Sequence, residues 1–188
     1  DGGATSYTIP LLSSLPDGRC AVYIDAVKGA GTMTEVLYFD NGTLINGAYD
    51  QQSAASTLTY RASSVTISDI NGDEIPDIPM QIEFLGMAGV NESEKSYITV
   101  WCNYTPKGLI KKLTAYMNYT DYYSFELPDG WQDSVTLQKD SKKRVRNFYS
   151  FNKKTNEAGD LLLQLMTVTK DTFGDGKAYI SDGYTLIA

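Results

Sequence analysis

The stretch Thr34-Glu-Val-Leu-Tyr-Phe-Asp-Asn-Gly-Thr-Leu-Ile45 predicts a β-hairpin, and with it the fold class of the chain. Its two apolar runs flank Asn41-Gly42, and both turn residues tolerate the positive φ angles that a tight hairpin turn requires. The preceding run Cys20–Val27 alternates apolar with small or polar residues, which predicts a partner strand. We therefore expect antiparallel β structure in this region.

Further runs along the chain have the length and composition of strands, and Gly, Asn and Pro residues separate them. The last run also fits a short helix, because periodicity alone does not distinguish a buried strand from a buried helix. We expect a mainly β protein of antiparallel hairpins, with a β-rich unit at 1–117 and a second β-rich or α+β unit at 118–188. The predicted strands are Ser64–Ile67, Ile78–Leu85, Tyr97–Tyr104, Leu109–Tyr116, Val145–Phe151 and Leu161–Val168.

The stretch Asp69-Ile-Asn-Gly-Asp-Glu-Ile-Pro-Asp77 has the ligand spacing of a small calcium-binding loop. Calcium takes about six to eight oxygen ligands, and alternate residues of a tight loop aim their oxygens to one side. Gly72 permits the sharp turn between two of these residues. The alternative is a simple Asp/Asn/Gly-rich turn without an ion. The predicted ligands are Asp69, Asn71, Asp73, the Ile75 carbonyl and Asp77.

The loop differs from a helix-loop-helix calcium hand, because Glu74 and Met80 stand where that motif has its glycine and its bidentate glutamate. It resembles the calcium loop of FG-GAP-type repeats, as in integrin-like and VCBS-type proteins of bacterial surfaces. The resemblance implies a blade-like β unit and a structural calcium ion. Glu74 departs from the family's usual glycine. The residues that carry the resemblance are Asp69, Asn71, Gly72, Asp73, Pro76 and Asp77.

The number of blade-like units limits what this resemblance implies for the whole fold. Besides the unit around the acidic loop, residues 20–47 are a second candidate blade. A propeller needs about four or more blades. We therefore expect either a piece of a longer propeller or the same loop in another β fold. The sequence Asp171–Tyr179 lacks ligands at two loop positions and is interpreted as a hairpin turn.

The composition excludes several classes of function. There is no histidine in the 188 residues, which removes the commonest general base and the usual ligand of catalytic zinc. The net charge of -7 argues against a nucleic-acid partner, which needs a basic face. The basic cluster Lys142-Lys143-Arg144 with Arg146 is interpreted as solvated charge at the start of a strand. No apolar run approaches the ~20 residues of a membrane-spanning helix.

Aromatic residues are concentrated after the first predicted unit and form a candidate ligand platform. Aromatic faces with polar neighbours stack on sugars or anchor protein partners. Tyrosine also simply favours strands, so packing in a sheet is the alternative. The nearby acids Glu126, Asp129 and Asp133 leave open a carbohydrate-active hydrolase that uses paired carboxylates. The residues of the platform are Tyr119, Tyr122, Tyr123 and Trp131.

Cys20 and Cys102, the two cysteines, allow either a disulfide or two separate thiols. The polar start Asp1-Gly2-Gly3 and the uncapped strand Gly183–Ala188 indicate a trimmed chain of an exported protein, with a lipid anchor on a missing N-terminus as one option. We expect a non-catalytic extracellular or cell-surface module with structural calcium, which binds a glycan or a surface protein. The rival hypotheses are the hydrolase and a purely structural domain of a lipid-anchored surface protein.

Overall fold

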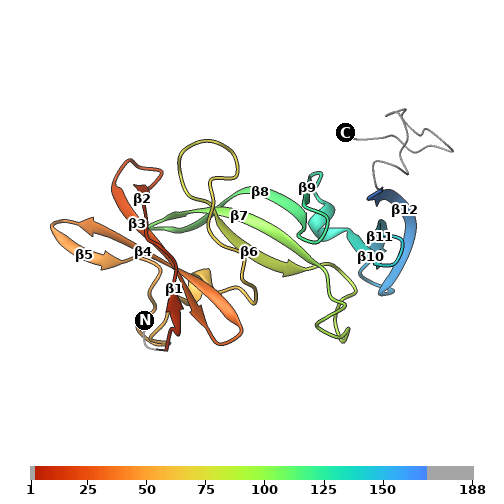
Figure 1. Ribbon diagram of the computed structural model, residues 1–188, viewed down its shortest axis with the longest axis horizontal. Coiled ribbons are helices and arrows are strands. Elements are labelled where there is room, and N and C mark those ends of the chain that lie inside the picture. The colour runs from red at the N-terminus through yellow and green to blue at the C-terminus, as the bar shows by residue number, and fades with distance from the viewer. Residues whose placement is uncertain (1–2, 169–188) are drawn as a thin grey trace. The chain divides into compact units, whose positions relative to one another are not determined.

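The computed structural model describes residues 3–168 and confirms the mainly β architecture (Figure 1). Strands in this range form three antiparallel sheets, and two single-turn 3₁₀ helices connect them. The strands are β1 Ser6–Tyr7, β2 Leu11–Ser14, β3 Cys20–Lys28, β4 Gly31–Asp40, β5 Thr43–Asn46, β6 Ile78–Glu83, β7 Tyr97–Thr105, β8 Gly108–Asn118, β9 Tyr123–Glu126, β10 Val135–Asp140, β11 Val145–Asn152 and β12 Glu157–Met166; the 3₁₀ helices are η1 Thr57–Thr59 and η2 Trp131–Asp133. The predicted turn 171–179 and strand 183–188 lie outside the described residues.

Two compact units divide the described chain. The first contains residues 3–82, 97–117 and 124–127, and the second contains 83–96, 118–123 and 128–168. The predicted division into continuous units at 1–117 and 118–188 stays a prediction. Residues 83–96 group with the later part of the chain, which no sequence pattern predicted, and the two units are therefore interleaved along the sequence.

The predicted Asn-Gly hairpin is present as β4 and β5 in the first unit. Asn41 has a φ of 49° and Gly42 a φ of 81°, and the flanking pair Asp40 and Thr43 closes the ladder. β4 also pairs with β3, which pairs along its other edge with β1 and β2. The alternation along β3 buries one side of the sheet, which is why Tyr23 is completely inaccessible.

The core of the first unit lies between this sheet and residues of the sheet β6-β7-β8-β9. Tyr38 of β4 and Tyr104 of β7 pack with ring centroids 6.1 Å apart, so aromatic contacts join strands from both sheets. Ile78, the first residue of β6, is completely buried in the same cluster. The core residues are Leu15, Ala21, Tyr23, Val36, Tyr38, Ala48, Ile78 and Tyr104.

The second unit is built on the sheet β10-β11-β12. Phe148 of β11 is completely buried and packs edge to face against Phe84, with centroids 6.0 Å apart. The Trp131 ring packs against the same Phe148 ring, with centroids 5.9 Å apart. The ambiguous run Leu161–Met166 is a strand and belongs to β12, which starts earlier, at Glu157.

One predicted strand is wrong. Residues Ser64–Ile67 form no strand, because side chains elsewhere take up their backbone groups. The Val65 carbonyl accepts a hydrogen bond from Arg61, and the Ile67 amide donates to Asp25. The sequence also failed to predict β1, β2 and β10, whose apolar runs are short.

Cys20 and Cys102 are both free thiols, which resolves the two alternatives in favour of separate cysteines. Cys20 is exposed, and Cys102 is buried in β7. Burial raises the pKa of the Cys102 thiol to about 11, so almost none of it is the reactive thiolate at neutral pH.

We expect iodoacetamide to label Cys20 in the native protein and Cys102 only after unfolding. Peptide mass spectrometry after timed labelling at pH 7.5 measures both sites. The Cys20→Ser variant should take up no label until denaturant is added. Equal labelling rates at the two cysteines of the native protein would contradict this assignment.

Candidate calcium-binding loop

The acidic loop is closed by a short backbone bridge. Ser68 and Asp77 exchange two backbone hydrogen bonds, 3.2 Å and 2.9 Å long. Asp77 is completely buried and is followed at once by Ile78 at the start of β6. Because the bridge and β6 hold both ends, residues 69–76 form a closed loop on the first unit. The hydroxyl of Ser13 donates to the carbonyl of Glu74 at 2.9 Å and ties the tip of the loop to β2.

The carboxylate of Asp69 shapes the loop from inside. One of its oxygens accepts the amides of Gly72 at 2.7 Å and Asp73 at 3.2 Å, and the other accepts the amide of Glu74 at 2.9 Å. Gly72 has a φ of 77° and Glu74 a φ of 64°. Glu74 therefore adopts the left-handed conformation that glycine adopts freely, at a cost of about 1 kcal/mol.

Asn71 and Asp73 bind each other. The side-chain oxygen Oδ1 of Asn71 accepts a hydrogen bond from the Asp73 backbone amide, and Asn71 Nδ2 donates to Asp73 Oδ2, both at 3.0 Å. Asp73 Oδ1 accepts the amide of Ile75 at 2.9 Å. This backbone hydrogen bond is the main reason why the pKa of Asp73 lies below its ordinary value. Asp73 thus stays ionised over a wider acidic range.

Asp77 is the buried member of the predicted ligand set. Its Oδ1 accepts Asn103 Nδ2 at 2.7 Å, and its Oδ2 accepts the amide of Ile70 at 3.1 Å. Burial raises the pKa of Asp77, and the negative charges of Asp73 and Asp69 raise it further. The three carboxylates therefore share one electrostatic environment, in which a cation would be favoured.

The chemistry of these donors fits calcium, although their arrangement is incomplete. A carboxylate offers about four acceptor sites, so each of the three keeps acceptor capacity after its hydrogen bonds. Hard oxygen donors are the ligands that calcium prefers. Within residues 3–168, however, no three Cys, Asp or Glu side chains gather into a metal-binding group by themselves. The predicted set therefore also requires the Asn71 amide and the Ile75 carbonyl.

A lysine already supplies one positive charge to the loop. Lys112 of β8 places its ammonium 3.6 Å from Asp73 Oδ2 and lowers the pKa of both Asp73 and Asp77. The side chains of Lys112 and Asp73 are about one third exposed, so water screens the pair. Lys112 is therefore a weak internal competitor for any bound cation, and sequence reasoning did not find it because it lies 39 positions from Asp73.

We expect Lys112→Met to strengthen calcium binding about twofold to fivefold. The substitution removes a partly screened positive charge, whose repulsion of the bound cation costs roughly 0.5–1 kcal/mol. Isothermal titration with calcium measures the change. Lys111→Met, the neighbouring exposed lysine on β8, is the matched control and should leave the affinity unchanged. Weaker calcium binding by Lys112→Met would show that the lysine supports the site instead of competing with it.

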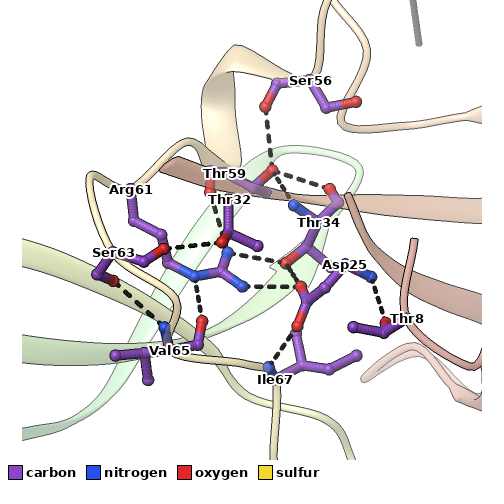
Figure 2. A network of polar contacts seen from close by, with 10 residues as sticks. All are labelled: Thr8, Asp25, Thr32, Thr34, Ser56, Thr59, Arg61, Ser63, Val65 and Ile67. Carbon is purple, nitrogen blue, oxygen red and sulfur yellow. Dashed lines mark hydrogen bonds and ion pairs between the residues drawn. The ribbon is translucent and has the colours of Figure 1, made fainter. Parts of the chain in front are cut away.

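A buried polar network positions the segment that leads into the loop (Figure 2). The guanidinium of Arg61 donates to Asp25 Oδ1 at 2.8 Å, and both side chains are at most 1% exposed. Arg61 also donates to Thr34 Oγ1 at 3.0 Å, and Thr34 donates to the same Asp25 oxygen at 2.6 Å. The other Asp25 oxygen accepts the amide of Ile67 at 2.9 Å, two residues before the loop.

This network fixes irregular chain where a sheet ladder is absent. Arg61 donates to the carbonyl of Val65 at 2.6 Å, and its backbone exchanges two hydrogen bonds with Thr32 on β4. The Thr59 hydroxyl accepts a hydrogen bond from the amide of Thr34 and donates one to the carbonyl of the same residue. The segment 59–67 is therefore attached to β3 and β4 mainly by side chains. At Ile67 the network ends two residues before the acidic loop.

The four aromatic residues of the predicted platform have different environments in the second unit. Tyr119 is 54% exposed and Tyr122 is 93% exposed. Tyr123 is half-buried, and burial raises its pKa. Trp131 packs on Phe148, so much of its face is used inside the unit. Tyr119 and Tyr122 are thus the members that offer most surface to a ligand.

The carboxylates of the hydrolase hypothesis are all exposed to solvent. Asp133 forms an ion pair with Lys153 at 3.1 Å, in which both side chains are more than half exposed. Such exposed ion pairs contribute little to the free energy of unfolding. In the second unit, neither Asp129 nor Asp133 lines the cavity of about 630 Å³ between residues 86–94 and β10 to β12.

No family model, no curated protein and no solved structure matches this chain. In the part of the chain that the structure describes, no helix has the length and apolar character to cross a membrane.

Proposed function

We propose that this chain is a non-catalytic module of an extracellular or cell-surface protein, stabilised by calcium in the loop at 69–77. The observation that carries the proposal is the geometry of the loop: the Ser68–Asp77 backbone bridge closes it, and the completely buried carboxylate of Asp77 repels the carboxylates of Asp69 and Asp73. A divalent cation offsets such repulsion directly. The FG-GAP-like sequence of the loop supports the same assignment.

A stabilising ion explains what the loop contributes. A ligand that binds the folded state alone, at about ten times its dissociation constant, adds roughly 1.4 kcal/mol to the free energy of unfolding. Extracellular calcium modules bind at dissociation constants of about 0.1–1 mM, which suits the calcium level outside cells. We assign the binding role of the module to a glycan or a surface protein, with Tyr119 and Tyr122 as contact residues.

Isothermal titration of the full chain with calcium and with magnesium tests the ion assignment. We expect heat of binding with calcium and a much weaker signal with magnesium, because magnesium requires a smaller octahedral site and gives up its water reluctantly. Asp73→Asn should remove the calcium signal, whereas Asp129→Asn, an exposed acid outside the loop, should keep it. Calcium heat that is equal in wild type and Asp73→Asn would overturn the site.

A further inference from the structure

The loop at 118–123 in the second unit presents its tyrosines on a rigid support. Asn118 Oδ1 accepts the amides of Thr120 and Asp121 at 3.1 Å, and Asn118 Nδ2 donates to Asp121 Oδ2 at 2.9 Å. The Asp121 carboxylate is only 1% exposed. The loop is therefore held by its own buried polar groups while Tyr122 remains almost completely in water.

A basic turn is attached to this loop. Arg144 Nε donates to Asp121 Oδ1 at 2.7 Å, and Arg146 Nη2 lies 3.9 Å from the other oxygen of the same carboxylate. Arg144 follows Lys142 and Lys143, both exposed. This contact brings the turn 141–144 beside residues 118–123. We name the exposed residues Tyr119, Tyr122, Lys142, Lys143 and Arg144 the tyrosine–lysine patch.

The patch has a local charge opposite to that of the whole chain. Four cations, at 142, 143, 144 and 146, face two carboxylates, Asp121 and Asp140, although the chain carries a net charge of -7. Lys143 is 79% exposed and lies 3.8 Å from Asp140, so its ammonium is only weakly engaged. An acidic ligand would therefore be attracted here, although the chain as a whole is negatively charged.

Two residues of the patch have left-handed backbone conformations. Tyr122 has a φ of 56° and Arg144 a φ of 54°, although neither residue is a glycine. Tyr122, at 93% exposure, contributes almost nothing to the core. Strained residues of this kind persist where the surroundings fix them, and they cluster at binding sites.

We infer that the tyrosine–lysine patch binds an acidic polysaccharide, with tyrosine rings against the sugar faces and lysine ammonium groups on the carboxylates. This inference rests on the proposed binding role and names its ligand class. Nucleic acid fits less well, because a duplex carries one charge per about 1.7 Å and requires many cationic contacts from a basic face. A polyuronate carries one charge per sugar, which two or three lysine and arginine side chains match.

The test is isothermal titration calorimetry of the full chain with oligogalacturonate in low salt. A neutral malto-oligosaccharide of equal length and a single-stranded oligonucleotide serve as comparison ligands. We expect binding of oligogalacturonate alone. Lys142→Gln with Lys143→Gln should weaken it about fivefold to tenfold. Tyr122→Asn, which removes the ring but tolerates the left-handed backbone, should weaken it to a similar extent.

Lys153→Gln with Lys154→Gln is the matched control, because it removes the same charge from the turn at the other end of β11. Its affinity should equal that of the wild type. Absence of oligogalacturonate binding, unchanged binding by the Lys142 and Lys143 variant, or tighter binding of the neutral sugar or the oligonucleotide would each overturn the inference. Thermal unfolding of the same samples with and without calcium tests the calcium site separately. A calcium-dependent rise in unfolding temperature without oligogalacturonate binding would overturn the polysaccharide inference and leave the calcium site standing.

Discussion

Asp25→Ala is expected to lower the free energy of unfolding of the first unit by about 3–5 kcal/mol, because it leaves a buried cation without its counter-charge. Arg61 is completely buried, and burial already lowers its pKa against the opposing effect of Asp25. The variant also removes the acceptors of the Thr34 hydroxyl and the Ile67 amide. The destabilisation should therefore extend to the segment that leads into the acidic loop.

Urea unfolding followed by tryptophan fluorescence measures this effect. Trp101 belongs to the first unit and Trp131 to the second, so a Trp131→Phe background leaves a single reporter for the first unit. Asp17→Ala is the matched control: its ion pair with Arg19 is 2.7 Å long but one third to one half exposed, so its loss should leave the urea midpoint almost unchanged. Equal effects of the two variants would disprove the role given to the buried pair.

Phe148→Ala is expected to cost the second unit about 3–5 kcal/mol, the usual loss for a fully buried phenylalanine. Phe148 is completely inaccessible and supports the rings of both Phe84 and Trp131, so its removal leaves a cavity that two aromatic neighbours cannot fill without moving. Hydrogen exchange of the amides in β10 to β12 measures the loss.

Phe39→Ala provides the comparison for this second result. Phe39 also lies on a strand but is 63% exposed, so its truncation should change stability by less than about 0.5 kcal/mol. Unchanged protection of β10 to β12 in Phe148→Ala would contradict the core described for the second unit. A loss in Phe39→Ala as large as that in Phe148→Ala would contradict it as well.

Local signals in the sequence were sufficient for much of the fold. The Asn41-Gly42 hairpin forms because its turn chemistry and its flanking apolar runs agree, and both are contained in twelve residues. The strands at 97–104 and 109–116 were predicted for the same reason. The loop at 69–77 also folds on itself, with Asp69 accepting three amides that follow within five positions. Such features need no knowledge of distant residues.

Long-range contacts account for what the sequence could not predict. Asp25 and Arg61 are 36 positions apart, and nothing in either neighbourhood marks them as partners. Their network takes up the backbone groups of Val65 and Ile67, which is why the strand predicted at 64–67 does not form. The pairing of Arg144 with Asp121 likewise joins two segments 23 positions apart. The pattern of charges alone predicted solvated residues there.

Thermal unfolding in millimolar calcium and in excess EDTA tests the central claim, the calcium site at 69–77, most directly. The account predicts that calcium raises the unfolding temperature of the first unit, that EDTA reverses the rise, and that Asp73→Asn, which keeps an acceptor for the Ile75 amide, abolishes it. Identical unfolding temperatures of the wild type in calcium and in EDTA would contradict the claim.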